Sequence, residues 1–224
     1  MQRDGARALP GPEKKDYEDG LPVGPEVPPG RYSITIALEH PDSQATVASI
    51  DVQTVGDPRS DHSQADIEQN YAMQVELLGL QKSVVGAVEQ IVRARDDIAT
   101  VTKLIDARKG ADEDEELTAL KEQAKNVRKR LGELEKRFRS PPKTKGYTYT
   151  ADKISSKVSM AQGYVASTKD VPSAAAKTYI SIARASVDEG LSALNEFMAG
   201  ELQAFRESVE QAGIGLLSDI QPLK

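Results

Sequence analysis

The sequence contains no cysteine, no tryptophan and only two histidines. Without cysteine, the chain has no disulfide, no thiolate zinc or iron–sulfur site and no thiol nucleophile. The two histidines, His40 and His62, have no partner at metal-ligand spacing, and we interpret both as exposed polar residues. These absences exclude several classes of enzyme and leave the redox state of the compartment open.

Aromatic residues make up only 4 % of the chain, and no stretch reaches the ~18 apolar residues of a membrane span. Residues 1–15 also lack the apolar core of a signal peptide. The net charge of −6 argues against a nucleic-acid binder, which is usually basic. We therefore expect a chain that stays outside the lipid bilayer, carries no export signal and binds no nucleic acid.

Motifs that carry chemistry are also missing. A di-iron bundle needs Glu-x-x-His motifs, and a phosphate site needs a glycine-rich loop, but the sequence contains neither. Basic residues cluster towards the end of the segment 112–139 and after it, where they could face phosphates or an acidic partner; we interpret them instead as a solvated face. We expect no catalytic residue, no metal, no cofactor and no small-molecule substrate.

Two apolar heptad seams dominate what is present. The first predicts a helix over about 65–108, and the second, after a break at Gly110, predicts a helix over about 112–139. The first seam consists of Leu77, Val84, Ile91, Ile98 and Ile105 with Leu80, Ala87, Ala94 and Val101; the second of Leu117, Leu120, Ala124, Val127, Leu131, Leu134 and Phe138. The two stripes predict a long antiparallel helical hairpin. Leu78, Val85 and Val92 widen the first stripe, so this helix should contact more than one neighbour.

Two further helices follow. One is expected over about 151–167, and another from near Pro172, with Asp170 as a cap, to Gly213. Gly190 and Gly200 should weaken the latter helix locally. We predict an elongated antiparallel four-helix bundle that thins to fewer helices at its far end.

The first 30 residues read as an extended arm rich in proline and glycine. Such a composition cannot bury enough surface to order itself, so we expect the arm to become ordered by lying on another surface, which points to a partner. The whole chain then divides into an arm (1–30), a β-hairpin or partial sandwich (31–58), a helical bundle (62–213) and a tail (214–224).

The hairpin is predicted from alternation. Tyr32, Ile34, Ile36 and Leu38 mark one half-buried strand, a polar loop over 39–45 follows, and a second strand runs to Val55. A lone hairpin is marginal in water, so it must pack on the helices or join a sheet supplied elsewhere, and its edge is a candidate for strand addition. Our candidate partner-binding residues are Tyr17, Leu21, Val23, Val27, Tyr32, Ile34, Tyr147 and Tyr149.

An ordered set of short motifs resembles a known family. The set consists of Pro29-Gly30-Arg31-Tyr32-Ser33-Ile34-Thr35-Ile36, Ile50-Asp51-Val52, Asp57-Pro58-Arg59, Ser63-Gln64-Ala65-Asp66, then Tyr149, Lys153, Val171-Pro172-Ser173, Glu201, Phe205 and Gly213. Over residues 27–215 it resembles the C-terminal region of bacterial exported repeat proteins that carry a sortilin-type or sialidase-type β-propeller and are often labelled glycosyl hydrolases. The resemblance implies an immunoglobulin-like sandwich followed by a long helical region. The propeller and most of the sandwich are missing, so no family site is carried over.

The expected function is that of a non-catalytic structural subunit. It would bind and stabilise a larger bacterial complex as an extrinsic subunit of a membrane assembly, for example a photosynthetic reaction centre with its light-harvesting ring. The alternatives are a glycan- or peptide-binding accessory module and a self-associating coiled coil. We expect a location peripheral to the inner membrane; the resemblance favours its periplasmic face and the missing signal peptide its cytoplasmic face.

Overall fold

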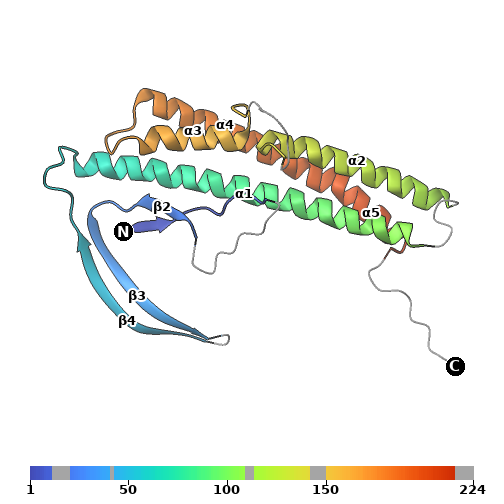
Figure 1. The fold of residues 1–224 in the computed structure, drawn as a ribbon, viewed down its shortest axis with the longest axis horizontal. Helices are drawn as coiled ribbons and strands as arrows, with labels where there is room; N and C mark the ends of the chain where they lie inside the picture. Colours follow the sequence, from blue (N-terminus) through green and yellow to red (C-terminus); the bar gives the residue numbers. More distant parts are fainter. Residues whose placement is uncertain (12–20, 41–42, 109–113, 142–149, 215–224) are drawn as a thin grey trace.

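The structure, a computed structural model, describes residues 1–11, 21–40, 43–108, 114–141 and 150–214. It is mainly helical, with an elongated bundle and two small antiparallel sheets (Figure 1). This confirms the predicted fold class of a helical bundle with a β-hairpin.

Helix α1 (Gln64–Asp106) forms the spine of the bundle and is about 64 Å long at 1.5 Å per residue. It begins at Ser63, whose hydroxyl accepts a hydrogen bond of 3.2 Å from the Asp66 amide. The predicted seam is confirmed, since Leu77, Ile91 and Ile105 have no exposed surface.

Helix α2 (Glu115–Phe138) runs antiparallel to the C-terminal half of α1 (Figure 1). The Asp114 carboxylate caps its N-terminus by accepting hydrogen bonds from the Glu116 and Leu117 amides at 2.9 and 3.2 Å. All seven residues of the second predicted seam are buried, which confirms the helical hairpin.

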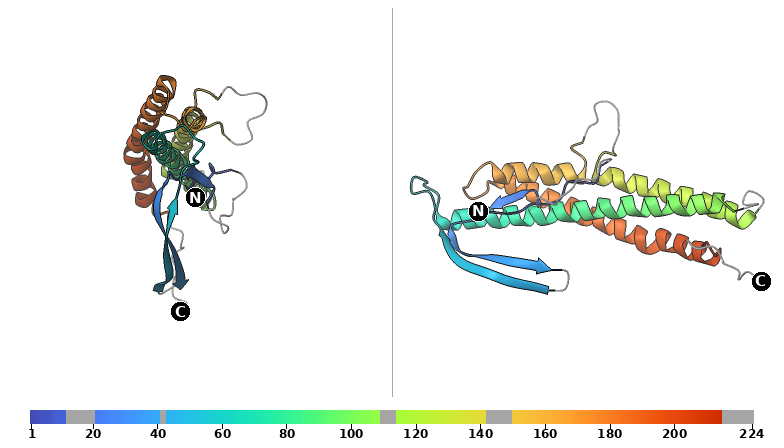
Figure 2. Two further views of the ribbon diagram at one scale, coloured as in Figure 1. Left: turned by 90° about the vertical axis from the view of Figure 1, so that its left-hand side faces the viewer. Right: turned by 60° about the horizontal axis from the view of Figure 1, so that its bottom comes forward.

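The remaining helices complete the bundle. Helix α3 (Ile154–Ala166) covers the N-terminal half of α1, end to end with α2, and α4 (Ala174–Phe197) continues through the π-helical turn η1 (Met198–Leu202) into α5 (Gln203–Gln211). The expected single last helix is therefore continuous but contains one widened turn. Because α2 and α3 share one side of α1 in succession, the bundle keeps its thickness along its length (Figure 2), and the expected thinning at the far end is not observed.

Two local expectations about α4 are corrected. Its N-cap is Ser173, whose hydroxyl accepts from the Ala176 amide at 3.2 Å, and Asp170 lies outside the helix. Gly190 does not weaken α4 but permits close packing, because a Cβ there would overlap Ile154 and lie 3.1 Å from the Phe138 ring. The predicted end at Gly213 is confirmed by its φ of +61°.

The composition of the N-terminal arm predicted an extended segment, but the described part of the arm contains two short strands. Strands β1 (Gln2–Asp4) and β2 (Val23–Glu26) pair antiparallel, and the Val27 amide donates to the Met1 carbonyl at 3.0 Å. The described part of the arm lies on the chain's own bundle, where β2 contacts α1 and Ala6 is 7 % exposed. The surface that orders it therefore belongs to this chain.

Strands β3 (Gly30–His40) and β4 (Ser43–Thr54) form a second antiparallel sheet. The strands extend through most of the segment predicted as a polar loop, because backbone pairing does not require apolar side chains. The pairing register shifts after Ile36, which leaves Val47 without a partner, as in a β-bulge. Figures 1 and 2 show this hairpin curving away from the bundle.

Candidate interaction surface

The β3–β4 hairpin has one apolar and one polar face. Ile34 pairs with Ile50 and Ile36 with Ala48, so these side chains project to the same side. The alternate positions carry the polar side chains of Arg31, Ser33, Thr35, Ser49, Asp51 and Gln53. We call the first side the apolar hairpin face and define it by Tyr32, Ile34, Ile36, Leu38, Ala48, Ile50 and Val52.

Most of the apolar hairpin face is in contact with solvent. Ile34 is 42 % exposed, Ile36 61 %, Leu38 65 % and Ile50 63 %. The unpaired Val47 is 63 % exposed. Isolated exposed apolar residues are normal, whereas a continuous strip of them along one sheet is a candidate interaction surface.

Hydrogen bonds fix the base of the hairpin, and one of them joins it to the bundle. The Tyr32 hydroxyl donates to the Pro28 carbonyl at 2.7 Å, and the Gly30 amide donates to Thr54 Oγ1 at 3.0 Å. Gln64, in the first turn of α1, donates from Nε2 to the Pro29 carbonyl at 2.9 Å. The Gln64 contact ties the segment just before β3 to α1, whereas the other two bonds lie within the hairpin and the residues that precede it.

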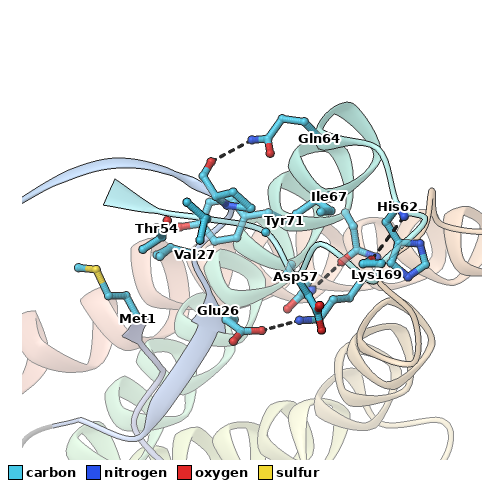
Figure 3. Close-up of a pocket in the computed structure, with 16 residues that line it drawn as sticks. Met1, Glu26, Val27, Thr54, Asp57, His62, Gln64, Ile67, Tyr71 and Lys169 are labelled. Atoms are coloured by element: carbon cyan, nitrogen blue, oxygen red, sulfur yellow. Dashed lines mark hydrogen bonds and ion pairs between the residues drawn. The ribbon is translucent and has the colours of Figure 1, made fainter. Parts of the chain in front are cut away.

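A hollow of about 550 Å³ lies beside this joint, between β2, the hairpin base and the start of α1 (Figure 3). An ion pair and a contact between a histidine and an aspartate lie at its rim. Glu26 Oε2 lies 2.9 Å from Lys169 Nζ, and His62 Nδ1 lies 2.5 Å from Asp170 Oδ1. The hydrogen bond from Lys169 holds the pKa of the Glu26 carboxyl below its ordinary value.

His62 thus corrects one expectation, because it is partnered and its side chain is only 30 % exposed. The side chain of His40 lies outside the described residues. Since the charged groups at the rim are paired with each other, the arrangement acts as a joint between segments. Within the described ranges, no group of three or more His, Asp or Glu side chains could hold a metal ion.

The arm is attached to the bundle at two further points. Arg3 donates to the Tyr71 hydroxyl of α1 at 3.4 Å. Farther along, the Arg139 guanidinium donates to the Pro10 carbonyl and to Glu135 Oε1, at 2.8 Å from Nη2. Glu135 is 1 % exposed and pairs in addition with Arg95 of α1, so one buried ionic group joins the arm, α1 and α2.

The arm also accounts for the wide apolar stripe of α1. Residues 5–9 of the arm lie against Leu78 and Val85, which are 5 % and 6 % exposed. The sequence predicted that α1 contacts more than one neighbour, which is confirmed, because α2, α3, α4 and the arm all contact it.

The candidate partner-binding residues fall into three groups. Tyr32 and Ile34 lie on the apolar hairpin face, with Tyr32 half-buried at its base. Val23 on β2 is 71 % exposed, Leu21 is half-buried, and Val27 lines the hollow at the joint. Tyr17, Tyr147 and Tyr149 lie outside the described residues.

Sequence reasoning did not select the outer part of the same face as partner-binding. Ile36, Leu38 and Ile50 are more exposed than Ile34 and were identified only as strand residues. The alternation that revealed the strand contained the signal, but it did not show whether a helix covers that face.

Comparison with protein-family models, curated proteins and solved structures found no match to this chain. The resemblance to propeller-bearing exported proteins therefore stays a prediction. Among the helices of the described ranges, none combines the length and apolar character needed to cross a bilayer.

Proposed function

We propose that this chain is a non-catalytic structural subunit that docks onto a larger assembly through its β3–β4 hairpin, with the helical bundle as a rigid strut. The observation that carries the proposal is the apolar hairpin face, whose residues Ile36, Leu38 and Ile50 are 61–65 % exposed. A long bundle with its core filled and a projecting apolar strip is suited to holding a neighbour.

The area of the apolar hairpin face limits the binding free energy that docking through this face can provide. The face spans residues 32–38 of β3 and the strand paired with them, which gives about 220 Å² at ~3.3 Å per residue and ~4.8 Å between strands. Burying it contributes about 5 kcal/mol at ~25 cal/mol per Å². Association costs about 4–15 kcal/mol. Stable docking therefore needs contacts in addition to this face.

The arm has a different role from the one expected from its composition. Its described residues are held by Arg139, by Tyr71 and by the apolar side of α1, so these residues have a surface of their own chain to lie on. The hairpin takes its place as the docking element in our proposal.

We extend the proposal to an extrinsic subunit of a bacterial membrane assembly, on the strength of the family resemblance and the elongated shape. A photosynthetic reaction centre with its light-harvesting ring is one possible host. The bundle would then lie against the host's exposed protein on one side of the membrane.

The test is to isolate the tagged full-length chain from its source organism in mild detergent and to measure its mass by native electrophoresis and light scattering. We expect it in a membrane-derived complex at a constant ratio to the other subunits. Recovery of the chain as a free monomer at physiological salt contradicts the proposal.

The two alternative functions, a self-associating coiled coil and a glycan-binding module, would use different surfaces and are tested by different measurements. A self-associating coiled coil would use the wide stripe of α1, and the arm covers Leu78 and Val85 of that stripe. A glycan-binding module would give strong hits on a glycan array, and such hits would replace our proposal.

A further inference from the structure

The two free edges of the β3–β4 hairpin are not equivalent. Among the described strands, β3 and β4 pair only with each other, so each has one open row of backbone donors and acceptors. Strand β4 carries the unpaired Val47, and such a bulge bends the strand and disrupts its edge. Strand β3 carries no extra residue over Gly30–His40. Both strands lack proline and lysine, which usually protect an edge, so the bulge is what distinguishes the two edges.

The regular edge belongs to the same strand as the most exposed apolar residues. Ile36 and Leu38 of β3 are 61 % and 65 % exposed. A strand that added to β3 would extend the apolar hairpin face, and its own alternate side chains would lie beside these residues.

The charge of the hairpin favours a neutral protein surface over lipid. Residues 30–54 contain one basic residue, Arg31, against three acidic ones, Glu39, Asp42 and Asp51. Attraction to anionic headgroups needs clusters of lysine and arginine, so this hairpin is repelled from such a surface.

A second copy of this chain is a poor occupant on grounds of area. Two apolar hairpin faces packed together cover about 440 Å² from the strand spacings, which is below the ~1,200 Å² of stable protein interfaces. Pairing two β3 edges instead would leave both apolar faces exposed to water. A partner that pairs with the β3 edge and also covers the apolar hairpin face adds backbone hydrogen bonds to the small buried area and leaves no apolar face exposed.

We propose that β3 is the docking edge, at which a strand from an open β-sheet of a partner protein is added, and that the apolar hairpin face becomes part of the partner's hydrophobic core. This inference rests on the proposed function and specifies its partner as a neutral, apolar sheet surface. The backbone hydrogen bonds along β3 are the contacts that the face alone lacks.

The first experiment compares variants one residue apart on opposite faces. Ile36→Lys places a charge on the apolar hairpin face, whereas Thr35→Lys adds the same charge on the polar face. We expect Ile36→Lys, and Ile50→Lys on the paired strand, to lower recovery of the tagged chain in its native assembly at least tenfold, and Thr35→Lys to leave it within twofold. Equal recovery of all three variants refutes the inference and also docking through the hairpin, and leaves standing only the part of the proposed function that makes the chain a subunit of an assembly.

The second experiment measures the edge directly. Amide hydrogen exchange of the peptide covering 30–40 should slow at least tenfold in the assembly relative to the isolated chain. Photo-crosslinkers at positions 34, 36 and 38 should attach to every second residue of one partner segment, the period of a β-strand. Crosslinks to lipid, crosslinks without this period, or a dimer of the isolated chain with protected β3 amides would each overturn the inference. Failure of the chain to join any assembly removes the proposed function as well.

Discussion

At the scale of single residues, the structure depends on a few side chains that connect distant segments. Glu135 of α2, 1 % exposed, pairs with Arg139 and with Arg95 of α1. A buried carboxylate is tolerated only when it is paired, and Arg139 in turn holds the arm through the Pro10 carbonyl. The arm, α1 and α2 are thus joined at one ionic centre.

Removing the acid from this centre should be costly. Glu135→Ala leaves the Arg139 guanidinium, whose side chain is 9 % exposed, buried without its carboxylate, and we expect the free energy of unfolding to fall by about 3–5 kcal/mol. The double variant Glu135→Leu, Arg139→Met removes both charges and should be less destabilised than the single variant. Urea denaturation measures both, and equal losses would show that packing, not pairing, sets the cost.

Two helical glycines give a matched pair for packing. Gly190→Ala should lower the free energy of unfolding by about 1–3 kcal/mol, because the added methyl overlaps Ile154 and crowds Phe138. Gly163→Ala in α3 meets nothing within 4 Å and should raise it by about 0.5–1 kcal/mol through helix propensity. Thermal unfolding followed by circular dichroism compares them, and a stabilising Gly190→Ala would contradict the packing described.

At the scale of elements, the arm and α1 complement each other. The arm is short of apolar residues but supplies Ala6 and Leu9 to a helix whose stripe is wider than α2 and α3 can cover. The helices bury most of the apolar surface of α1, and Leu78, Val85 and Ala6 are buried on the side where the arm lies.

Deleting residues 1–11 should expose this stripe. We expect the free energy of unfolding to fall by about 2–4 kcal/mol, since Leu78 and Val85 lose their cover. The truncated chain should also self-associate in a concentration-dependent way in analytical ultracentrifugation. Adding Leu78→Ser and Val85→Ser to the truncated chain should restore the monomer; persistence of the dimer would place the contact elsewhere.

At the scale of the whole molecule, stability and docking are assigned to separate parts. The buried hydrophobic cluster comes from the helices, and the hairpin adds no buried residue to it within the described ranges. The fold of the bundle therefore does not depend on whether the hairpin is exposed to solvent or bound to a partner.

This separation predicts that the hairpin is dispensable for folding. Replacing Ser33–Asp51 with a short Gly-Ser loop keeps the Tyr32–Val52 pair at the base and should leave Tm within about 2 °C. Phe138→Ala, in the bundle core, should lower Tm by about 10 °C in the same calorimetric series. A large drop for the loop variant would mean that the hairpin packs on the bundle in solution.

The helices could be predicted because their signals are local. Heptad spacing located both seams, and the glycine at Gly213 located the end of the last helix. Asn70 shows the limit of this reasoning. It is 2 % exposed within α1, and its side chain donates to the carbonyls of Val165, Thr168 and Asp170 at 2.9–3.2 Å. These residues lie about a hundred positions away in the chain, so no local sequence pattern predicts the contact.

The sequence by itself determined the periodic elements of this protein, namely the helical seams and the alternating strands, because side chains three, four or two residues apart share a face whatever surrounds them. Only the tertiary structure decided which faces are covered. It laid the arm over Leu78 and Val85 of α1 and left Ile36 and Ile50 of the hairpin exposed, because burial depends on contacts between segments far apart in the chain.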